Sequence, residues 1–239
     1  MKVVAIIPAR WGSTRFPGKV LTPIAGKPMI TRVWEKARAA SGIDDVIVAT
    51  DDDRIADTVR EFGGRVEMTR SDHESGSDRI AEVAARIEAD AIINVQGDEP
   101  LVRSGDLDRL AAMMREDRIV RVASLCHAIS DEEANNPNRV KVVRNAAGDA
   151  LYFSRAKIPH PRHGDYAQYF QHAGIYAYRR SDLLAFSTLL VPAEERAEAL
   201  EQLRYLAAGI AIRLIETEPS GPGVDAPEDV AIVEKLLAR

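Results

Sequence analysis

Residues 3–7 read Val3-Val4-Ala5-Ile6-Ile7, and this unbroken apolar run decides the fold class. An alternating strand would present one apolar face, so a continuous run predicts a strand that is covered on both faces. A loop rich in glycine and proline follows it. Pro28 then suits the first turn of a helix that ends near Gly42. The chain therefore begins with a strand, a loop and a helix.

The same order of elements recurs along the first hundred residues. Short apolar runs predict further strands at 46–49, 66–68 and 91–95. Residues 50–53 are predicted to cap a helix that ends at the Gly63-Gly64 pair, and the polar loop 71–78 leads into another helix. Repeated strand–helix alternation implies a parallel sheet with right-handed crossovers.

The second half of the chain has a more mixed pattern. The predicted strands are 120–127, 140–144, 151–154, 169–178 and 210–215, and the predicted helices are 194–208 and 227–237. A short helical turn is expected after Ser130 and a hairpin turn at 145–149. We therefore predict an α/β fold: a Rossmann-like, mostly parallel sheet with helices on both faces, in one domain over 1–239. A mixed or antiparallel subregion is inserted at approximately 120–180.

Composition sets limits on the function. The chain has 239 residues, is 46% hydrophobic and 29% charged, and carries a net charge of −5, which argues against general nucleic-acid binding. Its one cysteine, Cys126, excludes an internal disulfide framework and fits a reducing compartment. No signal peptide or membrane span is expected, so we predict a cytoplasmic protein that does not associate with membranes.

A basic N-terminal block stands out from this acidic average. Residues 1–38 carry eight Lys or Arg against one acidic residue, Glu35. This asymmetry suggests an anionic ligand near the N-terminus, although a solvated basic surface would give the same count.

Three polar loops follow predicted strands, where ligands bind in an open parallel sheet. They span 8–19, 71–79 and 96–100. The first resembles a Walker A loop, except that Pro17 replaces its second glycine and Val20 its Ser or Thr. Its three cations and two hydroxyls suit a triphosphate, and these residues are Arg10, Arg15, Lys19, Ser13 and Thr14. The alternative is a flexible basic loop.

Carboxylates are the second candidate feature. Asp98 and Glu99 follow a strand directly, a common place for a Mg²⁺ ligand. Asp225 has capping-box spacing to Glu228, so from the residues alone it is a helix cap as readily as a ligand. The loop 71–79 could bind a base or ribose, or cap a helix at Ser77. His172 and Tyr176 lie at even spacing and share one strand face.

Taken together, these stretches resemble the 3-deoxy-manno-octulosonate cytidylyltransferase family, also called CMP-Kdo synthetases. The resemblance spans nearly the whole chain in order. It rests on residues 6–10, 13–19, 72–73, 75–79, 94–100, 136–138, 140–143, 152–155, 172, 174–176, 201–204 and 224–229. Trp11-Gly12, Val20 and His160 depart from the family pattern, and residues 160–168 match it poorly.

The resemblance implies transfer of CMP from CTP to the anomeric hydroxyl of 3-deoxy-D-manno-octulosonate (Kdo), giving CMP-Kdo and pyrophosphate for lipopolysaccharide biosynthesis. It implies Mg²⁺ at Asp98 and Asp225, with Lys19 as a third catalytic residue. Nucleotide contacts would come from Pro8, Ala9, Arg10, Ser13, Thr14, Arg15, Lys19, Ser75, Gly76, Ser77 and Arg79. Contacts to the acidic 2-keto sugar would come from Gln96, Arg155, His172, Tyr176, Glu201 and Gln202. A homodimer formed through the inserted subregion is also implied.

Three alternatives stay open at this point. A cytidylyltransferase could act on a related acidic sugar, 8-amino-Kdo or sialic acid. A glycosyltransferase would use a D-x-D metal motif, and Asp51-Asp52-Asp53 matches that pattern in a position that helix capping also explains. A catalytically silent nucleotide-binding regulator would not need both carboxylates, Asp98 and Asp225.

Overall fold

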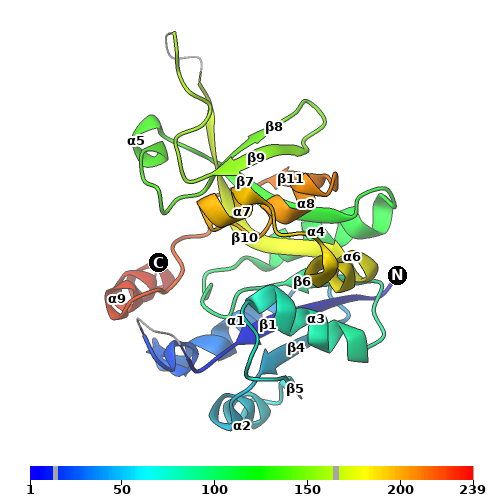
Figure 1. Cartoon of the computed structure of the whole chain (residues 1–239). Coiled ribbons are helices and arrows are strands. Elements are labelled where there is room, and N and C mark those ends of the chain that lie inside the picture. Colours follow the sequence, from blue (N-terminus) through cyan, green and yellow to red (C-terminus); the bar gives the residue numbers. More distant parts are fainter. Residues whose placement is uncertain (13–15, 164–166, 239) are drawn as a thin grey trace. The chain divides into compact units, whose positions relative to one another are not determined.

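The computed structural model of the chain describes residues 1–12, 16–163 and 167–238. The chain divides into two compact units (Figure 1). One comprises Met1–Ala112 with Ser220–Arg239, and the other Met113–Pro219. The second unit contains the stretch 120–180 for which a mixed subregion is expected. The expectation of one domain over 1–239 stays a prediction.

The first unit contains a four-stranded parallel sheet. Its strands are β1 (Val3–Ala9), β4 (Asp45–Thr50), β5 (Arg65–Met68) and β6 (Ala91–Asn94). Their order is β6-β1-β4-β5, with Ala5 opposite Val46 on one side of β1 and Ile93 on the other. All seven residues of β1 are buried, as its continuous apolar run predicts. The four predicted parallel strands are therefore confirmed.

Helices cover both faces of this sheet. The helices of the unit are α1 (Met29–Arg38), α2 (Asp53–Glu61), α3 (Gly76–Arg86), α4 (Ser104–Glu116) and α9 (Pro227–Leu237). Right-handed crossovers from β1 through β4 to β5 put α1 and α2 on one face. The return from β5 to β6 puts α3 on the other face, and α3 lies in front of the sheet in Figure 1. A short 3-10 helix, η1 (Lys19–Leu21), and a small hairpin of β2 (Pro23–Ile24) and β3 (Lys27–Pro28) precede α1.

Two helix starts test the predicted caps. The Asp52 side chain accepts a hydrogen bond from the Arg54 amide, so the predicted cap within 50–53 is confirmed. Helix α3 is capped by Ser75, whose hydroxyl accepts from the Asp78 amide at 3.1 Å. The prediction of Ser77 as a cap is wrong, because Ser77 already lies inside the first turn of α3.

The second unit contains mixed β-structure. Its strands are β7 (Val122–Ile129), β8 (Lys141–Arg144), β9 (Ala150–Ser154), β10 (Tyr169–Arg179) and β11 (Ile212–Glu216). Strand β7 pairs antiparallel with β10 and parallel with β11, and β8 pairs antiparallel with β9 and β10. The predicted turn at 145–149 joins β8 to β9, with Gly148 in the left-handed region at φ +84°. The mixed character of this stretch is confirmed.

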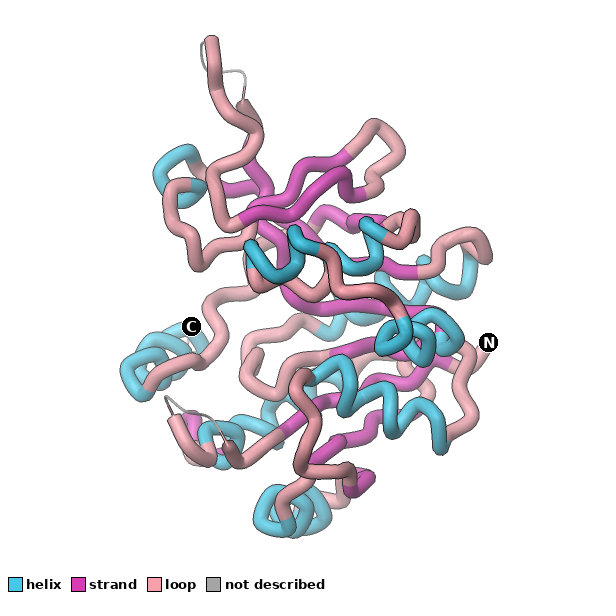
Figure 2. The backbone as a smooth tube through the Cα atoms, in the orientation of Figure 1, coloured by secondary structure: helices cyan, strands magenta, loops and turns pink. Residues whose placement is uncertain are grey.

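The helices of the second unit are short. They are α5 (Asp131–Ala134), α6 (Arg180–Ala185), α7 (Ala193–Glu198), α8 (Leu203–Ala207) and the 3-10 helix η2 (Phe186–Thr188). The prediction of one helix over 194–208 is wrong. Ala199 adopts φ +51° and ψ +52°, which ends α7 and separates it from α8 by the loop visible in Figure 2. The predicted helical turn after Ser130 is confirmed as α5.

None of the helices in the described part of the chain combines the length and the apolar character that a bilayer crossing requires.

Candidate active site

A polar cavity of about 360 Å³ lies beyond the carboxyl ends of β1 and β6 in the first unit. Ten of the predicted site residues line it: Pro8, Ala9, Arg10, Lys19, Ser75, Gly76, Arg79, Gln96, Asp98 and Asp225. They come from all three predicted polar loops and from the segment before α9. The backbones approach closely there, because a Cβ added to Gly97 would lie 2.9 Å from the Pro8 carbonyl oxygen. The structure therefore joins residues that are more than 200 positions apart.

Lys19 lies at the centre of the charged part of this cavity. Its Nζ donates to Asp98 Oδ2 at 2.6 Å and to Asp225 Oδ1 at 3.3 Å. A third hydrogen bond, at 3.2 Å, goes to the Val224 carbonyl oxygen. Two carboxylates from distant segments thus face one cation, and the Lys19 side chain is only 15% exposed. Two carboxylate oxygens and one carbonyl oxygen therefore surround the Lys19 ammonium.

The segment that carries Asp225 is held in place by packing and by the backbone. Val224 belongs to a buried apolar cluster with Ile24, Met29 and Val233, and its amide donates to the Asp98 carbonyl at 2.9 Å. Burial of Val224 therefore places Asp225 beside Asp98.

The helix-cap interpretation of Asp225 is wrong. Helix α9 begins after Ala226, and Asp229 accepts hydrogen bonds from the amides of both Asp225 (2.8 Å) and Ala226 (2.9 Å). The backward-reaching carboxylate therefore belongs to Asp229 and not to Glu228, and the Asp225 carboxylate is directed to Lys19 instead. Its side chain is 66% exposed, so it remains accessible to a ligand.

The loop after β1 is closed by Trp11. The Trp11 carbonyl oxygen accepts from the Gly18 amide at 2.9 Å, and the Arg54 guanidinium lies 3.3 Å from the centre of the Trp11 ring. Gly18 has φ +68°, and a Cβ there would lie 2.8 Å from the indole. This closure fixes the start of η1 and with it Lys19. The predicted phosphate contacts Ser13, Thr14 and Arg15 lie outside the described residues.

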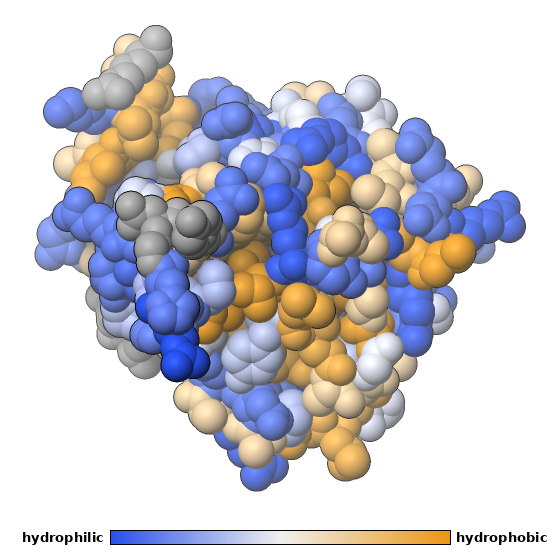
Figure 3. Space-filling view, turned by 90° about the horizontal axis from the view of Figure 1, so that it is seen from above, coloured by the Kyte–Doolittle hydropathy of each residue, from blue (hydrophilic) through white to orange (hydrophobic). Residues whose placement is uncertain are grey.

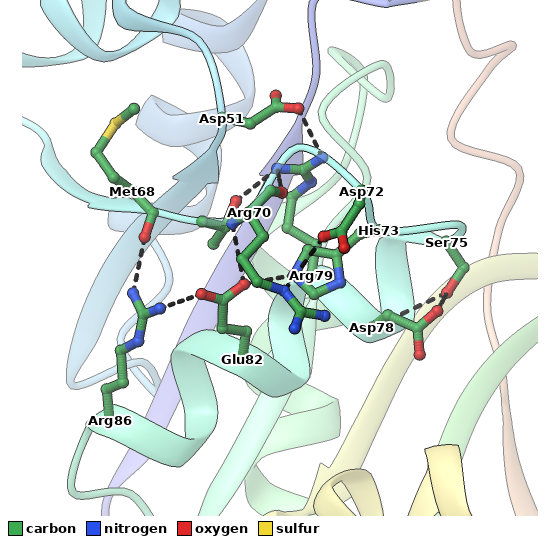
Figure 4. A network of polar contacts seen from close by, with 11 residues as sticks. Asp51, Met68, Arg70, Asp72, His73, Ser75, Asp78, Arg79, Glu82 and Arg86 are labelled. Carbon is green, nitrogen blue, oxygen red and sulfur yellow. Dashed lines mark hydrogen bonds and ion pairs between the residues drawn. The ribbon is translucent and has the colours of Figure 1, made fainter.

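Arg79 lies in the first turn of α3, and its side chain is buried. Its guanidinium donates to the Thr69 hydroxyl, to the Arg70 carbonyl at 3.4 Å and to Asp51 Oδ2 at 3.2 Å (Figure 4). Asp51 thus binds Arg79 while Asp52 caps α2, and neither lines the cavity. Asp53 lies in the first turn of α2, so the acidic triplet belongs to the start of that helix and its packing.

His73 lines the cavity and was not among the predicted site residues. Its Nε2 hydrogen-bonds the Glu82 carboxylate, which also binds Arg86 and accepts from the Arg70 amide at 3.1 Å (Figure 4). Burial raises the pKa of Glu82, but the hydrogen bonds from His73 and Arg70 and the charge of Arg86 lower it overall. The position of His73 inside a matched family segment was the available signal. Gly12, Val20 and Gly97 are further lining residues outside the predicted set.

Glu99 is a second residue that the predicted set omitted. Burial, together with the charges of Asp98 and Asp225, raises the pKa of Glu99 to about 7, although Lys19 lowers it in part. Its place directly after Asp98 was the signal. Within the described residues no cluster of three or more His, Cys, Asp or Glu side chains is arranged to hold a metal. A metal here would therefore need oxygen ligands from outside the protein as well.

The other predicted sugar contacts lie in the second unit. Arg155 follows β9, and Glu201 and Gln202 lie between α7 and α8. His172 and Tyr176 lie on β10 with ring centres 5.1 Å apart, and the His172 Nε2 hydrogen-bonds the Ser124 hydroxyl at 2.9 Å. The structure brings these two rings together on one strand, as their even spacing predicts.

Burial governs the ionisation of this pair. Burial and the neighbouring charge of His127 lower the pKa of His172 to about 3, so its imidazole is neutral at physiological pH. Burial, with the charges of Glu201 and Tyr205, raises the pKa of Tyr176 well above its ordinary value. Both side chains are therefore uncharged hydrogen-bonding groups.

Comparison with known proteins gives consistent matches. Residues 4–214 match the model of the cytidylyltransferase family. The chain is 52% identical to the 3-deoxy-manno-octulosonate cytidylyltransferase of Escherichia coli, over 100% of this chain and 97% of that protein. It is 49% identical to the protein of that name from Geobacter metallireducens, over 99% of this chain and 98% of the other.

Solved structures extend the comparison. A structure of CMP:2-keto-3-deoxy-manno-octonic acid synthetase complexed with CTP matches with a TM-score of 0.98 and 52% identity, covering 100% of this chain and 99% of that one. A cytidylyltransferase from Leptospira borgpetersenii matches with a TM-score of 0.68 and 18% identity, covering 100% and 87%. The second likeness concerns the fold alone.

Proposed function

Because the chain belongs to the 3-deoxy-manno-octulosonate cytidylyltransferase family, we propose that it transfers CMP from CTP to the anomeric hydroxyl of Kdo. The chain is a nucleotidyltransferase, and CMP-Kdo and pyrophosphate are the proposed products. The observation that carries this proposal is the convergence of Lys19, Asp98 and Asp225 in one cavity at the carboxyl ends of parallel strands. The CTP bound in the solved relative supports CTP as the nucleotide.

The proposed reaction is an in-line displacement at the α-phosphorus. The anomeric oxygen of the sugar attacks and forms a P–O bond to the α-phosphorus. The bond from that phosphorus to the oxygen bridging to the β-phosphate breaks, pyrophosphate leaves, and the hydroxyl proton passes to water. Such transfers depend on positioning and on neutralising charge, with little covalent work for the protein. Arg10 and Lys19 line the cavity and would offset the negative charge of the triphosphate.

The carboxylates fit a divalent cation. Asp98 and Asp225 already share one cation, the Lys19 ammonium, so their oxygens face a common point. Mg²⁺ binds one or two carboxylates together with phosphate oxygens and water, which suits a site with two protein carboxylates. We therefore assign Asp98 and Asp225 as its ligands. When bound, the ion would offset the negative charge on the phosphate oxygens during transfer.

The nucleoside and the sugar have separate candidate contacts. Ser75, Gly76 and Arg79 would bind the nucleotide at the start of α3, with Ser77 in the same turn. Arg155 is the proposed partner of the sugar carboxylate, because a guanidinium can bind it through two parallel hydrogen bonds. His172, Tyr176, Glu201, Gln202 and Gln96 would contact the sugar hydroxyls.

The proposal extends to the setting of the enzyme. A homodimer and a role in lipopolysaccharide biosynthesis belong to it by family membership. Cys126 is buried and free, which supports a reducing, cytoplasmic location. Hydrophobic surface on the face viewed in Figure 3 supports self-association.

Substrate choice is tested by measuring pyrophosphate release. Kdo, 8-amino-Kdo and sialic acid are each supplied with Mg²⁺ and CTP, and then with ATP, GTP or UTP. We expect release with Kdo and CTP, and none when Mg²⁺ is chelated. Faster release with 8-amino-Kdo or sialic acid would reassign the sugar, and no release with any acidic sugar would refute the proposal.

A further inference from the structure

Lys141 is a fully buried cation in the second unit. It lies on β8 with none of its surface exposed, and its Nζ donates three short hydrogen bonds. The acceptors are all backbone carbonyl oxygens, those of Asn136 (2.8 Å), Arg139 (2.6 Å) and Arg155 (2.7 Å). Among the described residues, the hydrogen-bond acceptors of Lys141 are these carbonyls and include no carboxylate, although the charge of Glu198 acts on Lys141 from nearby. A buried ammonium is costly, so a solely space-filling role would be better served by an apolar side chain.

The three carbonyls belong to the segments that surround Arg155. The Arg155 Nε donates to the Glu198 carbonyl at 2.7 Å, and Nη1 donates to the Pro137 carbonyl at 3.3 Å. Lys141 therefore binds the backbone of Arg155 itself and both sides of Pro137, through Asn136 and Arg139. The Lys141 ammonium therefore fixes the backbone of Arg155. It also fixes the segment around Pro137, whose carbonyl accepts a hydrogen bond from the guanidinium.

The end of α7 provides the other carbonyl groups that bind the Arg155 guanidinium. Ala199, in its left-handed conformation, ends the helix, and its carbonyl accepts from the Arg155 Nη2 at 3.5 Å. The Glu198 carboxylate is engaged elsewhere, by the Ser154 hydroxyl (2.6 Å) and the Arg155 amide (2.8 Å). In the described residues, the guanidinium is thus bound by carbonyl groups and not by a carboxylate. The two longer bonds, to the Pro137 and Ala199 carbonyls, are readily exchanged for an incoming anion.

We propose that Lys141 is a positioning residue, which holds the guanidinium of Arg155 in place to bind the carboxylate of the acidic sugar. This inference rests on the proposed function, because it deepens the role of Arg155 in it. Its chemical logic is that carbonyl dipoles orient a cation without neutralising it. A carboxylate in their place would compete with the substrate for the same guanidinium.

Kinetics of Lys141→Met test the proposal. Without the ammonium, Arg155 loses its fixed geometry, so KM for Kdo is expected to rise about ten-fold or more, as for a lost charge-assisted contact. KM for CTP should stay within about two-fold of wild type, because the nucleotide cavity lies in the first unit. Adding Arg155→Gln to Lys141→Met should change KM for Kdo by less than the two single effects combined, since both act through one contact.

Arg179→Met is the matched control. Arg179 is also a cation bound by backbone carbonyls, those of Val120 (3.0 Å) and Asp117 (2.7 Å), at the far end of β10. Its removal should lower thermal stability without a selective effect on KM for Kdo. If Lys141→Met does not fold, Lys141→Gln, which keeps an N–H donor, carries the same comparison.

Chemical rescue separates an electrostatic role from a packing role. Lys141→Ala removes a group that n-propylammonium can replace, so this cation should restore KM for Kdo toward wild type, and uncharged n-propanol should not. If the wild type is active and both Lys141→Met and Lys141→Gln keep its KM for Kdo, the inference about Lys141 is overturned and the proposed function still stands. A wild type that turns over no acidic sugar would overturn the proposed function and this inference with it.

Discussion

Lys19 explains how two carboxylates from distant parts of the chain lie close together. Unpaired, Asp98 and Asp225 would repel each other. The pKa of the neighbouring Glu99 is raised mainly by burial, and the negative charges of Asp98 and Asp225 raise it further. The ammonium at 2.6 and 3.3 Å offsets that repulsion. Lys19 therefore holds the two carboxylates in one arrangement, and preorganised charges of this kind limit reorganisation during electrostatic catalysis.

At the start of α9, Asp229 caps the helix and Asp225 faces Lys19, so substitutions of the two residues should have different effects. Asp225→Asn should lower turnover by about 100-fold or more, as losing a charge-stabilising group does, and leave the melting temperature almost unchanged. Asp229→Ala should destabilise the fold by about 0.5–2 kcal/mol through the lost cap and retain more activity. Pyrophosphate release and thermal melts check both. If Asp225→Asn lowered only the melting temperature, the cap assignment would have to be reversed.

The buried imidazole of His172 predicts a loss of stability in acid. Its pKa is lowered to about 3 in the folded state, so below about pH 6.5 only the unfolded chain takes up this proton. Stability should therefore fall as pH drops from about 6.5 toward 3. Between pH 7.5 and 5 the contribution is about 2 kcal/mol.

Urea unfolding of His172→Asn at these two pH values isolates this contribution. The variant should lose about 2 kcal/mol less than wild type over the interval. His163→Asn, at an exposed position, is the control and should behave as wild type. Equal losses in wild type and His172→Asn would show that the imidazole is protonated in the folded protein.

Residue types at strand ends allowed much of the site to be predicted. Arg10 and Asp98 were found because polar side chains follow apolar strands, and Lys19 because it lies in the same basic loop as Arg10. Asp225 stayed ambiguous, since Glu228 and Asp229 are both acidic and spacing alone does not show which one reaches back to the helix start. Arg155 came from the family resemblance, because no local pattern marks a carboxylate-binding arginine. Even spacing singled out His172 with Tyr176, but the assignment of His172 to the acidic sugar came from the resemblance.

Among the elements, the break between α7 and α8 is the clearest departure from expectation. Alanine is the best helix former, so Ala199 inside 194–208 favoured a continuous helix. Its left-handed conformation costs about 1–2 kcal/mol. The compensating contacts are tertiary, since the carbonyls of Glu198 and Ala199 both bind Arg155. Strands β1, β4 and β6 were predictable because their apolar runs need no distant partner to be recognised.

Two alanine-to-glycine substitutions test this account. Ala199→Gly should leave stability unchanged or raise it by up to about 1 kcal/mol, because glycine adopts φ +51° without strain. Ala197→Gly, two residues earlier inside α7, should lower it by about 1 kcal/mol. Melting curves should therefore shift in opposite directions or by clearly different amounts. A loss at position 199 as large as at 197 would mean that the helix continues through Ala199 in solution.

For the molecule as a whole, the basic N-terminal block proves to have two roles. Arg10 and Lys19 line the cavity, as the charge asymmetry suggested. Lys27 instead pairs with Glu35, and Arg32 donates to the carbonyls of Ile24 and Ala25, so these cations stabilise the hairpin region. Charge counting found the right segment. It could not separate ligand contacts from structural ones, because both use the same side chains.

Chain order also concealed how the first unit is completed. Residues 220–239 return to it after the whole second unit, through the packing of Val224 and Val233 on Ile24. No shift in composition marks the two crossings. Composition alone therefore suggests a single continuous domain. The contacts of Val224 and Val233 with Ile24, which join the two segments of the first unit, form only in the folded state.

The proposed homodimer is tested by mass and by charge substitution. The second unit exposes large apolar side chains, including Leu151 on β9 at 59%, within the predicted dimerisation stretch 120–180. Wild type should sediment at twice the 26.3 kDa mass of the chain. A two-fold symmetric interface through β9 would contain two Leu151 side chains, one from each protomer, and burying one leucine contributes about 1.5–3 kcal/mol. Leu151→Asp should therefore weaken the dimer at least about ten-fold.

Ile232→Asp, on α9 of the first unit and 50% exposed, is the control and should leave the dimer intact. A monomeric wild type would refute the dimer, and equal dissociation constants for Leu151→Asp and wild type would move the interface away from β9.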